Sequence, residues 1–136
     1  MVKVYIASKL ANAQLVIDRY RGPWLRDGID VHARWLDQAA IELGDSHIAE
    51  SQPDMSIFWR VDEEDVRDAD ALIVFALPGD RLRGALVEAG IAIANAVLVI
   101  VVGTHPDFGT WQHHPSVVRA VDMDHAKTMI LRRFRV

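Results

Sequence analysis

The chain has 136 residues, of which 51% are hydrophobic, enough to build one domain (residues 1–136) around a single core. Its 15 basic and 19 acidic residues give a formal net charge of −4 with no block of like charge, which argues against nucleic acid or a membrane surface as a partner. The absence of cysteine excludes disulfides and thiolate metal sites, and the first residues lack the apolar core of a signal peptide, so we expect a cytoplasmic protein.

Apolar runs typical of buried strands alternate with helical periods along the chain. In chain order we expect a strand at 2–7, a helix at 10–27 that kinks or breaks at Gly22-Pro23, a strand at 29–33, a short helix at 36–43, a lid-like loop at 44–54, a helix at 55–69, a strand at 71–76, a helix at 84–95, a strand at 97–102, a loop at 103–115, a short strand or helix at 117–121 and a final helix from 124. This alternation predicts an α/β fold of the doubly wound, flavodoxin-like type, with a five-stranded parallel sheet in the order 2-1-3-4-5 and helices on both faces.

One acidic residue stands out in the apolar segment GALVEAGIA at 84–92. Glu88 lies among small and apolar residues, where an ionised carboxylate without a partner is costly. Its place one turn into the predicted helix directs it towards the end of the sheet, and the helix dipole favours its ionised form there. Such a carboxylate serves either as a general base or as a nucleophile, and the alternative is an acid solvated at the edge of the helix. Tyr5, on the neighbouring first strand, can donate a hydrogen bond to it.

Ligands of open α/β sheets bind at the carboxyl ends of the strands, where the strand order reverses. Basic side chains at these ends suit a phosphate group, because guanidinium groups bind phosphate through two hydrogen bonds. Trp35 either stacks on a base or packs in the core. The candidate substrate-binding residues are Ser8, Lys9, Arg34, Trp35, Asp80, Arg81, Arg83 and Gly84.

Three segments, KVYIAS (3–8), RDADALIVF (67–75) and GALVEAGIAIA (84–94), resemble the nucleoside 2-deoxyribosyltransferase family, which includes N-glycosidases that act on nucleoside monophosphates. The resemblance implies that Glu88 is the catalytic nucleophile, that Tyr5 orients it, and that Asp70 is a further catalytic acid. It also implies a homo-oligomer in which a neighbouring subunit completes each site, with the stripe Ile57-Phe58-Val61 as a dimer contact. The chain departs from the family at Leu82, where relatives carry Asp or Ser.

We therefore expect an enzyme that cleaves the N-glycosidic bond of a nucleoside or its 5′-monophosphate and passes the sugar to water or to a second base. The alternative is a non-catalytic nucleotide-binding or regulatory module on the same fold. Six histidines occur without a zinc-binding H-E-x-x-H motif, and no phosphate-loop or dinucleotide motif is present, so we expect no metal and no cofactor. The expected partner is a small nucleoside or nucleotide.

Overall fold

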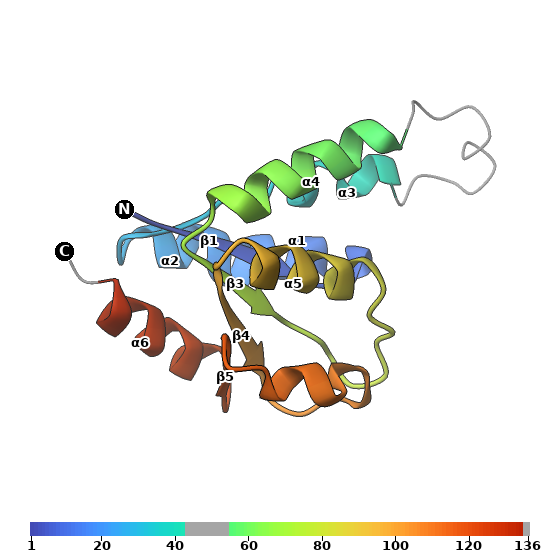
Figure 1. Ribbon diagram of the computed structural model, residues 1–136. Helices are drawn as coiled ribbons and strands as arrows, with labels where there is room; N and C mark the ends of the chain where they lie inside the picture. Colours follow the sequence, from blue (N-terminus) through green and yellow to red (C-terminus); the bar gives the residue numbers. More distant parts are fainter. Residues whose placement is uncertain (43–54, 135–136) are drawn as a thin grey trace.

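The computed structural model describes residues 1–42 and 55–134, and its centre is a parallel sheet of five strands in the order β2-β1-β3-β4-β5 (Figure 1). The predicted strand number and order are confirmed. The strands are β1 (Val2–Ala7), β2 (Ile29–Val31), β3 (Ala71–Val74), β4 (Leu98–Val102) and β5 (Val117–Ala120). The segment at 117–121, for which the sequence allows either a strand or a helix, is thus a strand.

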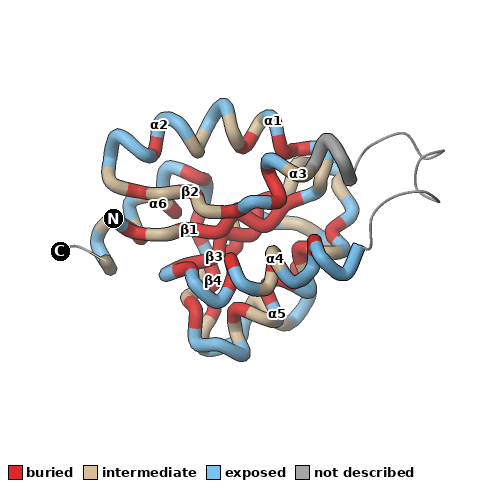
Figure 2. The backbone as a smooth tube through the Cα atoms, turned by 90° about the horizontal axis from the view of Figure 1, so that it is seen from above, coloured by how far each residue is buried: buried red, intermediate tan, exposed pale blue. Residues whose placement is uncertain are grey.

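Helices cover both faces of this sheet, as the right-handed crossovers of parallel strands require. The first helical segment lies on one side of the strands, and α4 and α5 lie side by side on the other (Figure 2). All four residues of β3 are buried, as expected for a strand covered on both faces. The longer helices are α3 (Trp35–Glu42), α4 (Ser56–Asp68), α5 (Gly84–Ala94) and α6 (Met123–Arg133).

The first helical segment runs without a break from Leu10 to Leu25. It consists of a 3-10 turn η1 (Leu10–Asn12), α1 (Ala13–Val16), a π turn η2 (Ile17–Arg21) and α2 (Gly22–Leu25). Of the two expectations at Gly22-Pro23, a kink or a break, the break is therefore wrong. Pro23 lacks a backbone N–H and clashes with a regular preceding turn, and the wider π turn just before it accommodates the proline ring.

The ends of the last two helices show how local residues fix the boundaries. Asp122 caps α6 by accepting a hydrogen bond from the backbone N–H of His125 at 2.8 Å. At the end of α5, Ala96 adopts a left-handed conformation with φ of 58°, and the N–H of Val97 returns to the carbonyl of Ala92. This terminus places β4 directly after α5.

Two further sequence expectations concern loops. The segment 103–115 contains two 3-10 turns, η4 (Pro106–Phe108) and η5 (Thr110–His113), rather than only loop. The predicted lid at 44–54 lies outside the described residues. In the part of the chain that the structure describes, no helix combines the length and apolar character needed to cross a membrane.

Candidate functional site

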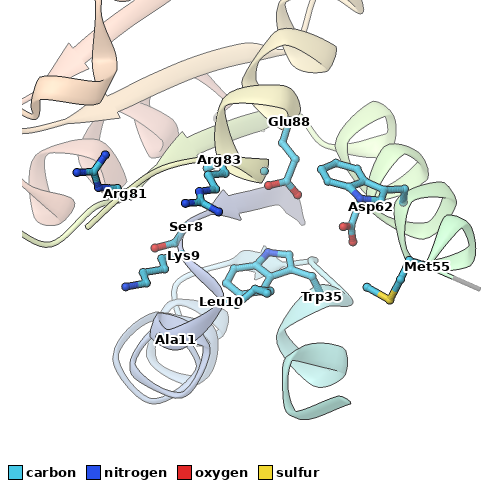
Figure 3. A pocket seen from close by; sticks show the side chains of 13 residues that line it. Ser8, Lys9, Leu10, Ala11, Trp35, Met55, Asp62, Arg81, Arg83 and Glu88 are labelled. Carbon is cyan, nitrogen blue, oxygen red and sulfur yellow. The ribbon is translucent and has the colours of Figure 1, made fainter. Parts of the chain in front are cut away.

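A cavity of about 530 Å³ opens at the carboxyl end of β1, between η1, α3, α4 and the start of α5 (Figure 3). This is the edge of the sheet at which the strand order reverses, where open α/β folds bind their ligands. Seven of the predicted site residues line the cavity: Ser8, Lys9, Trp35, Arg81, Arg83, Gly84 and Glu88. The cavity therefore lies at the edge of the sheet that the sequence rule selects.

Glu88 is the most deeply buried ionisable group of this cavity. Only 5% of its surface is exposed, and Tyr5, which is fully buried in β1, donates a hydrogen bond from its phenolic oxygen to Glu88 Oε2. Burial raises the pKa of Glu88 from its ordinary value of 4.5 to about 8. The helix dipole favours the ionised form, as the sequence leads us to expect, but the loss of hydration acts in the opposite direction and is the larger effect.

Two tryptophans line the cavity from different helices. Trp35 is 3% exposed, and its indole N–H donates to the backbone carbonyl of Ile6 at 2.9 Å, so only its ring surface is offered to a ligand. Trp59 of α4 is 41% exposed, and the end of its ring lies against Gly84. A Cβ atom added to Gly84 would lie 3.4 Å from the Trp59 ring. The glycine at the start of α5 therefore lets Trp59 lie close to the helix. The sequence analysis did not identify Trp59 as a residue of the cavity.

Asp62 is a second carboxyl of the cavity that the sequence analysis did not single out. It is 7% exposed, and its carboxylate and that of Glu88 are directed towards the same space (Figure 3). A signal for it exists in the sequence, because Asp62 shares the buried register of α4 with Phe58 and Val66. An acidic residue on the buried face of a helix is as good a sequence indication of a site residue as an acidic residue in an apolar segment, which is how Glu88 was found.

Three cations surround the mouth of the cavity. Lys9, Arg81 and Arg83 are exposed, and none of them forms an ion pair within the described residues. The backbone N–H groups at the start of α5 add partial positive charge at the same place. Unpaired cations beside a helix N-terminus form a favourable environment for an anionic group of a ligand.

Arg34 and Asp70, two predicted site residues, do not reach the cavity. Arg34 donates from its Nε to Asp65 Oδ1 at 3.0 Å and from its Nη2 to Glu64 at 3.1 Å, so it binds α4 instead of a ligand. Asp70 precedes β3 at the opposite end of the sheet, where its carboxylate accepts the backbone N–H of Lys3 at 2.9 Å. The assignment of Arg34 to substrate binding and of Asp70 to catalysis is corrected accordingly.

Asp80, also predicted to contact the substrate, lies behind the cavity wall. Its Oδ2 accepts hydrogen bonds from Asn12 Nδ2 at 2.8 Å and from the backbone N–H of Leu77 at 2.9 Å. Leu82, the departure from the family pattern, is 5% exposed and places no polar group in the cavity. Asp80 therefore does not take the place of the missing acid, and its influence on the site is indirect.

No protein-family model matches the chain, and no curated protein is significantly similar to it. Within residues 1–42 and 55–134, no group of three or more metal-ligating side chains lies close enough to hold a metal ion.

Proposed function

We propose that the protein cleaves the N-glycosidic bond of a nucleoside 5′-monophosphate or nucleoside, with Glu88 as the nucleophile. The observation that carries this proposal is the contact between the buried Glu88 carboxyl and the Tyr5 hydroxyl at the wall of a cavity lined by two tryptophans. A fixed carboxylate in a site with little water can capture the electron-poor C1′ atom of a sugar. Tryptophan rings beside it offer stacking surfaces for a base.

The reaction proceeds in two displacements. A carboxylate oxygen of Glu88 attacks C1′, the C1′–N bond breaks with its electron pair passing to the base, and the base takes up a proton. Water or a second base then attacks C1′ and releases Glu88, and the proton of the attacking group passes to solvent. Tyr5 holds Glu88 in line for both steps. Asp62, rather than Asp70 or Asp80, is the carboxyl placed to contact the sugar or the leaving base.

The three unpaired cations favour a monophosphate over a free nucleoside. A charge-assisted hydrogen bond to phosphate contributes roughly 1.5–3 kcal/mol, or about a tenfold or larger gain in affinity. We expect Arg83→Ala and Lys9→Ala to raise KM for monophosphates about tenfold and to leave KM for the matching nucleosides nearly unchanged. An equal change for both substrates would contradict a phosphate contact.

The decisive experiment is release of free base from a panel of nucleosides and monophosphates, followed by chromatography. Wild-type protein is compared with Glu88→Gln, which keeps the size of the side chain, and with Tyr5→Phe, which removes only the hydroxyl. We expect no base release by Glu88→Gln and about tenfold slower release by Tyr5→Phe, while Glu64→Gln on the exposed side of α4 behaves as wild type. Turnover retained in Glu88→Gln would remove this mechanism.

The rival function, a nucleotide-binding module without catalysis, uses the same cavity. It is favoured by one observation, the apolar Leu82 at a position where the resembled enzymes carry a polar residue. Saturable nucleotide binding by the wild-type protein without base release from any member of the panel would establish the rival.

A second copy of the chain is the partner that the resemblance implies. Four exposed apolar side chains support this proposal: Met55 and Trp59, which line the cavity, and Ile57 and Val87, elsewhere on α4 and α5. Phe58, part of the predicted dimer stripe, is 7% exposed and faces inward, so that part of the stripe is excluded. Light scattering of wild type and Ile57→Asp measures the oligomeric state, and a wild-type monomer would contradict the proposal.

A further inference from the structure

Ser8, at the end of β1, has its hydroxyl bonded by one buried neighbour. Asn12 Nδ2 donates to Ser8 Oγ at 3.0 Å, and both residues are at least nine-tenths buried, with 6% and 8% of their surfaces exposed. Within the described residues, Ser8 Oγ has no other hydrogen-bond partner. Ser8 also lines the cavity, on the same side as Lys9 (Figure 3).

The orientation of the Asn12 amide is set by Asp80. A carboxylate can only accept hydrogen bonds, so the amide must turn its nitrogen, and not its oxygen, towards Asp80 Oδ2 at 2.8 Å. The second hydrogen of the same nitrogen then points at Ser8 Oγ. The hydrogen bond from the backbone N–H of Leu77 to Asp80 Oδ2 holds the carboxylate in place at 2.9 Å.

The consequence concerns the proton of the Ser8 hydroxyl. Because one lone pair of Oγ is engaged by Asn12, the hydroxyl proton is confined to the two remaining directions, and Ser8 lines the cavity. The proton is therefore kept away from Asn12 before binding, and Ser8 can donate it to a ligand in the cavity. Such a donor selects an acceptor oxygen.

We propose that Asn12, oriented by Asp80, is a positioning residue that makes the Ser8 hydroxyl a hydrogen-bond donor to an oxygen of the sugar-phosphate part of the substrate. This inference rests on the proposed function for the identity of the substrate. It also gives Asp80, which does not touch the cavity, a role in recognition through Asn12.

An exchange of the two side chains tests the proposal by reversing the polarity of the contact. In the double variant Asn12→Asp/Asp80→Asn, the amide introduced at position 80 donates to the carboxylate introduced at position 12, so the bond between the two positions is kept, while the bond from the backbone N–H of Leu77 to the former Oδ2 is lost. That carboxylate cannot donate to Ser8, and the Ser8 proton turns towards it and away from the cavity. Net charge and side-chain volume are preserved.

Binding is measured by isothermal titration calorimetry with four 2′-deoxynucleoside 5′-monophosphates and their nucleosides, in the Glu88→Gln background to prevent turnover. We expect Ser8→Ala and the double variant each to weaken monophosphate binding about tenfold, and the double variant to unfold at a somewhat lower temperature because the Leu77 contact is lost, so binding is measured well below that temperature. Adding Ser8→Ala to the double variant should weaken binding little further. Asn95→Asp, the same change at the far end of α5, is the matched control and should bind as the parent does.

The outcomes separate this inference from the function on which it rests. Loss of affinity for monophosphates alone identifies a phosphoryl oxygen as the acceptor, and equal loss for nucleosides identifies a sugar oxygen. The inference is overturned if the double variant binds as the parent does, if it weakens binding equally with and without Ser8, or if no member of the panel binds. Base release by the wild type is scored separately, so its absence with binding intact overturns only the catalytic proposal.

Discussion

Burial of Glu88 makes a prediction about stability that needs no substrate. In the folded protein its pKa is about 8, whereas an exposed glutamate titrates near 4.5. Below pH 4.5 both states hold the proton, and burial has no effect through ionisation. As the pH rises towards 8 the unfolded chain loses this proton and the folded protein keeps it, so the free energy of unfolding falls by about 1.4 kcal/mol per pH unit. Above pH 8 both states are ionised and the loss is complete.

Glu88→Gln removes this dependence, because the amide does not titrate. It keeps an oxygen that can accept the hydrogen bond of Tyr5, so we expect the two proteins to differ little at pH 5. Between pH 5 and pH 8 the variant should gain roughly 3 to 4 kcal/mol of stability over the wild type, from the two pKa values of Glu88. Every other titrating group is common to both proteins and cancels in the comparison.

Urea unfolding at pH 5, 6, 7 and 8, followed by tryptophan fluorescence, measures the difference. Glu64→Gln is the matched control, since Glu64 is 70% exposed and its replacement should give no such trend. A stability difference that stays constant from pH 5 to pH 8 would refute the reasoning. It would show that the buried carboxyl is ionised in the folded protein at neutral pH.

Three further predictions follow from other described contacts. If Glu88 is the nucleophile, kcat/KM for base release should rise about tenfold per pH unit up to about pH 8 and then level off, and a fall over this range in a pH–rate profile would indicate a general acid instead. Ala96→Gly should raise stability by roughly 0.5–1 kcal/mol in urea unfolding, because glycine adopts the left-handed conformation at φ 58° without strain, and destabilisation would contradict this. Asp65→Ala should lower stability by roughly 1–2 kcal/mol, since it removes the buried carboxylate that accepts from the backbone N–H and the side chain of Arg34, whereas Glu64→Ala on the exposed partner of the same arginine should change it by less than about 1 kcal/mol.

The sheet was predictable because each buried strand appears in the sequence as a continuous apolar run. The segment at 71–74 is buried on both faces, and only a strand inside a parallel sheet needs such a continuous apolar run. The pairing of Tyr5 with Glu88 was predictable for a related reason, since the strand order and the helical turn together leave the two side chains adjacent. The strand at 71–74 and the contact of Tyr5 with Glu88 both depend on backbone geometry, and the spacing of apolar residues in the sequence indicates that geometry.

The partners of charged side chains were not predictable in the same way. Arg34 follows β2 at the expected edge of the sheet, yet Asp65, 31 residues further along the chain, binds it through both its backbone N–H and its side chain. Nothing in the periodicity indicates which of several acids a long side chain reaches. Asp62 was missed for the opposite reason, because a run of four acids at 62–65 looks like a solvated face until the buried register of α4 is known.

The segment that follows β3 shows how one stretch of chain can both anchor itself and supply charge to the cavity. Asp80 is bonded to Asn12, and the backbone N–H of Leu82 donates to Asp107 Oδ2 at 2.8 Å. The alternate residues Arg81 and Arg83 are left exposed at the cavity mouth. Because the inward residues make the contacts that hold the backbone, the arginines have no ion-pair partner among residues 1–42 and 55–134 and are available to a ligand. The apolar Leu82 fits this arrangement, since a buried position behind the wall needs packing and not charge.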